Sequence, residues 1–301
     1  MKSIIKIRKI FYILSATLFV LSIVAIFVFK FRIGIDFVGG TLIEFKSSKI
    51  SSTQDIRQDF SDIGKISSAS IQLSGKETAT IRTRELSDVE FNAFRKKLSE
   101  FDPQSEILSH ETIGPTVGKD LTQKSVIGVI LAIIGIIFYI AYAFRKIPKQ
   151  LSYWSFGGSA IVALIHDVVI TTGMYVILGK FLGWEVDSLF IVAILTILGF
   201  SVHDTIVVFD RIRENLIKNP GVNFKVIVDN SIRQTIDRSL NTSLTVILVL
   251  LSMLILGGET IKPFVATLAI GIFFGTYSSI FIASPIMYDW NKYIQKRTGN
   301  K

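Results

Sequence analysis

Six long apolar stretches alternate with polar segments along the chain. They are Phe11–Phe29, Ser125–Phe144, Ser159–Leu178, Leu189–Phe209, Ser239–Leu256 and Phe264–Met287. Each is close to the length of about 20 residues that a helix needs to cross a bilayer. Only helices and closed barrels satisfy their backbone hydrogen bonds in lipid. The pattern therefore predicts an α-helical integral membrane protein with six transmembrane helices.

The polar segment between the first two stretches, residues 40–122, has the pattern of a small water-soluble domain. Strands are expected at Thr41–Phe45, Ile66–Leu73, Glu77–Thr83 and Gln104–Thr112, helices at Thr53–Ile63, after Ser51 and Ser52, and from Ser87, and a turn at Ser74-Gly75. Ser87 and Glu90 have the spacing of a capping box. The order strand, helix, strand, strand, helix, strand predicts a ferredoxin-like α+β fold, which by itself indicates no activity.

These patterns divide the chain into four parts. Residues 1–39 hold a cytoplasmic N-terminus, the first transmembrane helix and a glycine-rich junction; 40–122 form the extracytoplasmic domain; 123–290 form a five-helix transmembrane bundle; and 291–301 form a cytoplasmic tail. The basic start of the chain also fits a signal peptide, but its apolar run is long and lacks a small-residue cleavage pattern, which favours an uncleaved anchor.

The lysine and arginine residues gather in alternate segments between the apolar stretches. The net charge is +9, and basic residues gather before the first span, after the second, between the fourth and fifth, and after the sixth. They include Lys2, Lys6, Arg8, Lys9, Arg145, Lys146, Lys149, Arg211, Arg213, Arg233, Arg238, Lys296 and Lys301. Since cytoplasmic loops retain Lys and Arg, both termini are expected in the cytoplasm, and no nucleic-acid partner is indicated. The absence of cysteine excludes disulfides and thiolate chemistry.

Two glycine-rich stretches flank the predicted domain. The first contains Gly34, Asp36, Gly39 and Gly40, and the second contains Gly114, Pro115 and Gly118. Neither has the glycine spacing followed by Lys-Ser or Lys-Thr that holds a nucleotide phosphate. Glycine permits close approach and unusual backbone angles, so the stretches are expected to be structural junctions between domain and membrane helices.

Two His-Asp pairs, His166-Asp167 and His203-Asp204, lie inside apolar stretches. A carboxylate at membrane depth costs about 2.5–3.5 kcal/mol on insertion scales, and such groups usually serve function. Three interpretations remain open: a metal site, proton handling or charge pairing coupled to movement, and simple hydrogen bonding between helices. An intramembrane aspartyl protease is disfavoured, because Gly-x-Gly-Asp is absent before Asp204.

Arg238 is a candidate partner for Asp204. Asp204 lies five residues before the end of its apolar stretch, or about 7.5 Å along a helix. The next stretch begins just after Arg238, from the same membrane surface. An Asp204–Arg238 pair and an ordinary positive-inside anchor at Arg238 are both compatible with this spacing.

Five motifs in register carry a family resemblance. They are Gly34–Gly40, Gly114–Gly118, Ala163–Val169, Thr205–Asn215 and Arg238–Ser243; the fourth includes Asp210, Arg211, Arg213, Glu214 and Asn215 at the cytoplasmic end of its helix. Together they resemble the SecF branch of the SecD/SecF protein-export family, related to the resistance-nodulation-division superfamily. His203 departs from the family's commoner asparagine, which leaves the hydrogen bonding of Asp204 open.

The resemblance implies a subunit that works with SecD beside the SecYEG channel, with YajC as a further candidate partner, in the bacterial cytoplasmic (inner) membrane. It would use the proton motive force to complete export of unfolded secretory polypeptides, without cofactor, metal or enzymatic activity. The resemblance assigns proton passage to Asp204 and Arg238; His203, Asp167 and His166 join them as proton-coupling candidates. The alternative is an independent proton-driven small-molecule transporter of the resistance-nodulation-division type.

Two further segments each have two interpretations. The spacing of Gly271 and Gly275 permits close helix packing, either within this chain or against SecD. The mixed-charge segment Asp210–Asp237 is expected to be an amphipathic helix or a solvated loop at the cytoplasmic surface.

Overall fold

The computed structural model describes residues 3–50, 52–63, 66, 69–74, 77–145 and 153–297. The sequence predictions that involve Lys2, Ser51, Gly75, Lys146, Lys149 and Lys301 lie outside these residues. The chain divides into two compact units. The first contains residues 1–31, 128–184 and 189–301, and the second contains residues 32–127 and 185–188.

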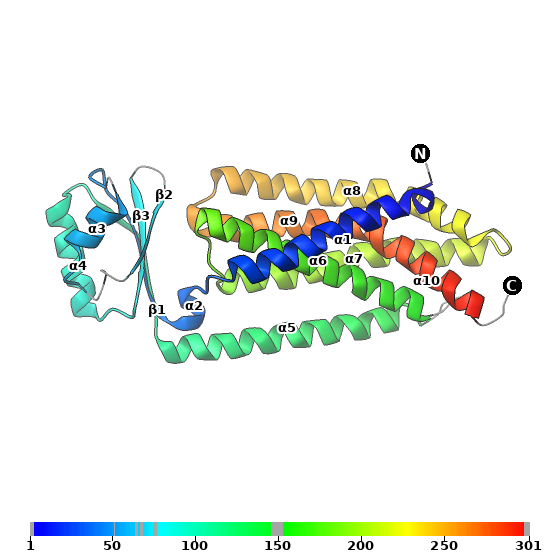
Figure 1. Ribbon diagram of the computed structural model, residues 1–301, viewed down its shortest axis with the longest axis horizontal. Helices are drawn as coiled ribbons and strands as arrows, with labels where there is room; N and C mark the ends of the chain where they lie inside the picture. Colours follow the sequence, from blue (N-terminus) through cyan, green and yellow to red (C-terminus); the bar gives the residue numbers. More distant parts are fainter. Residues whose placement is uncertain are drawn as a thin grey trace. The chain divides into compact units, whose positions relative to one another are not determined.

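The first unit is helical, and the predicted six membrane-spanning helices are confirmed (Figure 1). The spans are α1 (Ile4–Phe29), α5 (Pro115–Ala143), α6 (Tyr153–Leu182), α7 (Ser188–Lys218), α8 (Phe224–Leu256) and a composite last span. The last span follows the 3-10 turn η2 (Glu259–Ile261) and consists of α9 (Lys262–Ser278), the π-helix η3 (Ser279–Ala283) and α10 (Ser284–Arg297). Helix α6 packs against α1 and α9, and α9 packs against α8.

Small residues set the distances between these helices. A Cβ added to Gly173 of α6 would overlap Ser22 of α1, and one added to Gly271 of α9 would overlap the Ile197 side chain of α7. In membranes, where lipid is as apolar as the helices, such close van der Waals contact stabilises association. For Gly271 the geometry supports the first of the two interpretations, packing within this chain.

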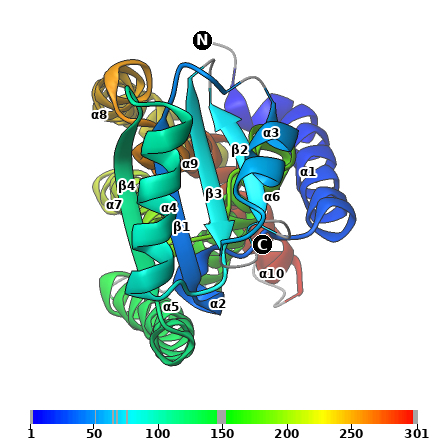
Figure 2. The same ribbon diagram turned by 90° about the vertical axis from the view of Figure 1, so that its left-hand side faces the viewer.

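The second unit contains a four-stranded antiparallel sheet with two helices on one face (Figure 2). Its elements are α2 (Ile35–Val38), β1 (Gly40–Lys46), α3 (Thr53–Asp59), β2 (Ser70–Ser74), β3 (Thr78–Thr83), α4 (Asp88–Phe101) and β4 (Glu106–Ile113). The sheet order is β2-β3-β1-β4. Phe45, Phe60 and Phe94 are fully buried between the sheet and the helices. The predicted ferredoxin-like α+β domain is confirmed.

Local sequence signals predicted the start of one of these elements correctly and the start of another incorrectly. The capping box of Ser87 and Glu90 is present at the start of α4. The predicted strand from Ile66 is wrong at its beginning, because β2 starts only at Ser70. Ile66 is buried, but its backbone makes turn-like hydrogen bonds to Ile63 and Ala69, both of 2.9 Å. Ile66 is apolar because its side chain lies in the hydrophobic core, not because it belongs to a strand.

The expectation for Asp210–Asp237 is right that most of these residues are helical, and wrong that they form a separate surface helix or a loop. These residues are the ends of α7 and α8, which continue as regular helices and are joined by a short turn around Gly221. The mixed charge reflects a helical hairpin that extends beyond the apolar stretches, not a separate surface helix.

Candidate functional site

Asp167 lies at the centre of the helical unit and is fully buried. Its Oδ2 accepts hydrogen bonds from the hydroxyls of Ser201 on α7 (2.6 Å) and Ser278 on α9 (2.7 Å). Its Oδ1 lies 2.9 Å from Nδ1 of His166, the preceding residue on α6. One carboxylate therefore joins three helices. Gly275, whose added Cβ would lie 3.2 Å from Cβ of Ser201, lets α9 approach this closely.

Asp204 occupies an equivalent position on α7. Only 6% of it is exposed, and its carboxylate accepts hydrogen bonds from Ser239 of α8 (2.6 Å) and Ser279 of η3 (3.1 Å). Thr276 also faces this carboxylate, and its hydroxyl bonds that of Ser243 on α8. The second carboxylate thus joins α7, α8 and the last span.

Neither His203 nor Arg238 forms a hydrogen bond or ion pair with these carboxylates in the part of the chain that the structure describes. Both are exposed on the surface of this chain. The described residues contain no ion pair between Asp204 and Arg238; the neighbouring residue Ser239 reaches the carboxylate instead. The proposed charge pair is therefore absent from this arrangement, and the carboxylate is held by neutral donors.

His166 is buried and has one free ring nitrogen. Its Nδ1 faces Asp167, and its Nε2 has no hydrogen-bond partner among the described residues. The ring stacks against Tyr277 with centroids 6.4 Å apart. The Tyr277 hydroxyl lies 3.1 Å from the Ser15 hydroxyl of α1, so polar side chains continue from Asp167 towards α1.

Sequence reasoning missed the hydroxyl donors Ser239, Ser278 and Ser279. A serine in an apolar helix is common, and each of these three also fits an ordinary helix-packing role. The adjacent pair Ser278-Ser279 in the middle of a span was the available signal. No cluster of three His, Cys, Asp or Glu side chains that could hold a metal ion occurs among the described residues.

The two glycine-rich stretches lie against one another in the second unit. Gly39 has a φ of 77°, and a Cβ there would lie 2.9 Å from Cα of Pro115. A Cβ on Gly118 would lie 3.0 Å from the carbonyl oxygen of Phe37. Larger residues do not fit either position without moving backbone.

The same glycine stretch holds residues 185–188, which connect α6 to α7. The Gly34 N–H donates to the carbonyl oxygen of Val186 (2.8 Å), and the Val186 N–H donates to that of Arg32 (2.7 Å). Asp36 accepts hydrogen bonds from the backbone N–H of Ser188 (2.8 Å) and from its hydroxyl. On β3, Arg82 lies 2.9 Å from Glu185.

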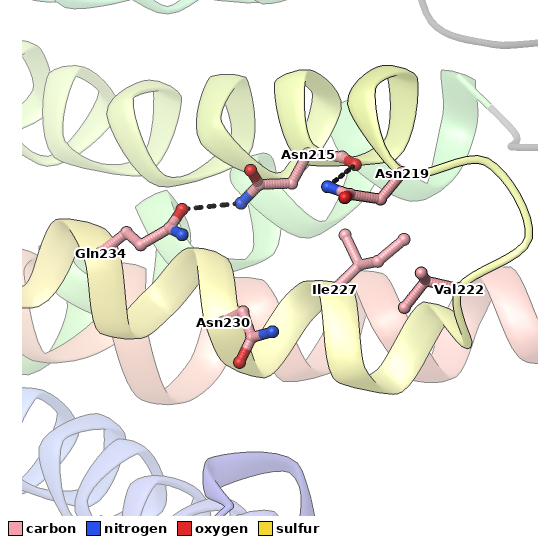
Figure 3. A pocket seen from close by; sticks show the side chains of 6 residues that line it. All are labelled: Asn215, Asn219, Val222, Ile227, Asn230 and Gln234. Carbon is pink, nitrogen blue, oxygen red and sulfur yellow. Dashed lines mark hydrogen bonds between the residues drawn. The ribbon is translucent and has the colours of Figure 1, made fainter.

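The motif Asp210–Asn215, near the end of α7, contacts α8. Within the motif, Asp210 pairs with Arg213 and Arg211 with Glu214. Asn215 donates to both Ser231 and Gln234 of α8, each at 2.8 Å. A cavity of about 150 Å³ opens beside these residues (Figure 3). It is lined by Asn215, Asn219, Val222, Ile227, Asn230 and Gln234, none of them charged, and contains neither carboxylate of the membrane core.

Two protein-family models match this chain. The family described as "Protein export membrane protein SecD/SecF, C-terminal" matches residues 93–293, and the "SecD/SecF GG Motif" matches residues 24–49. This chain belongs to the SecD/SecF family.

Its relatives in the SecD/SecF family are similar over almost the whole chain. "Protein translocase subunit SecF" of Thermobaculum terrenum is 40% identical, covering 96% of this chain and 94% of the relative. The protein of that name from Synechocystis sp. is 38% identical, covering 94% and 92%. "Protein translocase subunit SecDF" of Bacillus subtilis is 34% identical over 94% of this chain, which spans 37% of that relative. These relatives are named as translocase subunits.

A solved SecDF structure has the same fold. The crystal structure of SecDF from Thermus thermophilus, described as a translocon-associated membrane protein, matches with a TM-score of 0.83 and 31% identity. The match covers 96% of this chain and 38% of that one. Neither the SecF relatives nor this structure favours an independent small-molecule transporter.

Proposed function

We propose that this chain is the SecF-like half of a two-part export motor, which acts with SecD to use the proton motive force in completing protein export. The observation that carries the proposal is the pair of buried carboxylates, Asp167 and Asp204, each held across three helical segments by serine hydroxyls. No lysine or arginine among the described residues forms an ion pair with either.

Hydroxyl partners suit a group that gains and loses a proton. An ionised carboxylate only accepts hydrogen bonds, whereas a protonated one also donates. A serine hydroxyl donates and accepts, so it satisfies Asp204 in both states, which a lysine or arginine does not. A proton at Asp204 changes the bonds between α7, α8 and η3 without leaving a buried polar group unpaired.

The energy of proton entry is adequate for such a role. One elementary charge that moves through 100 mV supplies about 2.3 kcal/mol, enough to bias a two-state equilibrium roughly fifty-fold. Protonation that alters helix packing is therefore a sufficient drive for movement without a nucleotide.

The outer face of α7 and α8 supports a protein partner. Exposed polar residues recur at helical spacing on each of the two helices: Thr196 and His203 on α7, and Arg238, Asn241 and Thr242 on α8. A charged or strongly polar side chain facing lipid is costly and usually faces protein or water instead. A second six-helix bundle, that of SecD, would cover this face. The SecDF relatives, in which the match takes up little more than a third of the chain, fit this arrangement.

The positive-inside rule supports cytoplasmic termini in the bacterial inner membrane. Lys6 and Lys9 at the start of α1, and Arg211 and Arg213 near the end of α7, would share the cytoplasmic side, and the α+β domain would face outward. In this position the complex would act beside SecYEG, with YajC as a further candidate, on unfolded secretory polypeptides. Reporter fusions at residues 122 and 301 test the topology; activity of a periplasmic reporter at 301 would contradict it.

The deciding experiment reconstitutes the chain with SecD in vesicles and measures export and proton entry under an imposed proton gradient. Asp204→Asn should abolish proton entry and the dependence of export on the gradient. Asp120→Asn, an exposed carboxylate on α5 paired with Lys124, is the control. Export that keeps its full dependence on the gradient in Asp204→Asn vesicles would refute the proposal.

A further inference from the structure

The two buried carboxylates are linked through consecutive residues of one helical segment. Ser278 ends α9 and donates to Asp167, whereas Ser279 begins η3 and donates to Asp204. Both serines are fully buried. Because side chains of neighbouring helical residues point about 100° apart, one segment reaches a carboxylate on α6 with one hydroxyl and a carboxylate on α7 with the next.

Each of these hydroxyls has a second acceptor on its own helix. Ser278 Oγ lies 3.1 Å from the carbonyl oxygen of Gly275, and Ser279 Oγ lies 2.9 Å from that of Thr276. A hydroxyl carries a single proton, so it donates either to the carboxylate or to the carbonyl. Each serine therefore has two alternative hydrogen-bonding states.

The serine donors Ser201 and Ser239 differ in this respect. In the part of the chain that the structure describes, Ser201 donates only to Asp167, and Ser239 donates only to Asp204. Thr276 also faces Asp204, and it shares its hydroxyl with Ser243 of α8. Among the serines that the structure describes at the two carboxylates, Ser278 and Ser279 combine a carboxylate with an acceptor on their own helix, and they connect one carboxylate to the other.

The helix is irregular at this point. Ser279–Ala283 is a π-helix, and the Ser284 hydroxyl donates to the carbonyl oxygen of Ser279 (2.9 Å). π-helical turns are rare and frequent at functional sites, since they place backbone groups where an α-helix does not. This turn gives the segment carrying Ser279 a backbone arrangement that a regular helix lacks.

We propose that Ser278 and Ser279 are positioning residues that couple protonation of Asp167 to protonation of Asp204. The inference rests on the proton-carrying function proposed above. When one carboxylate takes up a proton, its serine turns its own proton to the helix carbonyl and accepts from the acid. Ser278 and Ser279 are adjacent residues of one helical segment, so a displacement of that segment at one carboxylate changes the hydrogen bond at the other.

Other titratable groups near the carboxylates are few. His166 contacts Asp167, His203 neighbours Asp204 in sequence, and Tyr277 precedes Ser278 and stacks on His166. The experiment must therefore separate the serine link from the histidines, and it keeps both histidines in every variant.

The test is infrared titration of carboxyl C=O bands in the full chain, reconstituted with SecD. Asp167→Asn isolates the Asp204 band and Asp204→Asn the Asp167 band; the native titration, in which both groups respond, is fitted with the two bands together. Asp167→Asn should move the Asp204 midpoint by about one pH unit, the scale of a coupled pair. With Ser278→Ala and Ser279→Ala together, the shift should vanish. Ser252→Ala is the matched control, because Ser252 bonds only the carbonyl of Val249 on its own helix.

Two results would overturn the inference. One is a shift that persists in the double-alanine background, which would mean direct electrostatic coupling; the other is no shift with the native serines. Ser278→Cys with Ser279→Cys preserves side-chain size but donates weakly, and it decides the question if the alanine pair does not assemble. Failure of the proposed function has a different result: neither carboxyl band responds to pH in any variant.

Discussion

Asp36 caps the first residue of α7, because its carboxylate accepts hydrogen bonds from both the backbone N–H and the hydroxyl of Ser188. The two residues are 152 positions apart in the chain. A carboxylate at a helix N-terminus satisfies free N–H groups and complements the helix dipole. The glycine-rich stretch that precedes β1 therefore also fixes the start of the helix that carries Asp204.

Replacing this cap should loosen the segment before α7. We expect Asp36→Ala to cost about 1 kcal/mol of local stability, whereas Asp36→Asn should cost less, because asparagine also caps helices. Hydrogen exchange of peptides covering residues 183–190 measures the effect. Asp120→Ala is the control for loss of a carboxylate. Unchanged exchange in Asp36→Ala would show that Ser188 finds another acceptor.

The stability of the second unit should depend on pH through Glu185, which contacts Arg82. Burial raises the pKa of Glu185, opposed by Arg82 and Arg32 and reinforced by Asp187. A raised folded-state pKa means that the folded state holds the proton more tightly than the unfolded state. The stability that this adds is present below the ordinary glutamate value of 4.5 and is lost as pH rises through the raised value.

Two variants test the direction of this pH dependence. The stability difference between the native chain and Glu185→Gln should decrease as the pH rises from 4 to 7, about the range above the ordinary glutamate value. Arg82→Met should steepen the decrease, because it removes the larger opposing charge. Hydrogen exchange of β3 against pH measures both. If the stability difference between the native chain and Glu185→Gln grew with pH, the pKa of Glu185 would be lowered, and its ion pair with Arg82 would outweigh the effect of burial.

Asp102 should control the acid stability of the α+β domain. It is buried after α4, and hydrogen bonds from Ser47, Gln104 and Ser48 lower its pKa from 3.8 to about 2. A lowered folded-state pKa contributes stability that is present above 3.8 and is lost as pH falls towards about 2.

The corresponding measurement is acid unfolding of the domain within the full chain. Asp102→Asn should remove this contribution, so that the native chain and the variant converge in stability as the pH falls through that window. Ser47→Ala, which removes one 2.8 Å donor, should give a smaller effect in the same direction. Parallel curves for the native and Asp102→Asn chains would contradict the assignment.

Gly271 should tolerate no side chain. A Cβ there overlaps the buried Ile197 side chain, so Gly271→Ala should lower stability by about 1–3 kcal/mol through overpacking. Thermal unfolding in detergent measures the loss. Gly135→Ala on α5, where a Cβ meets nothing within 4 Å, is the control. Adding Ile197→Ala to Gly271→Ala should restore part of the lost stability. If it does not, the added Cβ does not destabilise the protein through Ile197.

Much of the architecture follows from local sequence. The six spans are determined by the length of apolar runs, since a backbone in lipid must be helical. The ferredoxin-like order follows from alternation and from signals such as the Ser87–Glu90 capping box. The two intramembrane aspartates were visible because a carboxylate in an apolar run is rare.

Only the tertiary structure decided which side chains meet. Spacing from the membrane surface was compatible both with an Asp204–Arg238 pair and with Arg238 as an ordinary anchor. A helix presents residues 238 and 239 about 100° apart, and packing turned Ser239 inward. The pairing of Ser278 and Ser279 with two carboxylates depends on the π-helical turn and on how α6, α7 and α9 pack. Such rotations arise from contacts between distant segments, and no local pattern in the sequence encodes them.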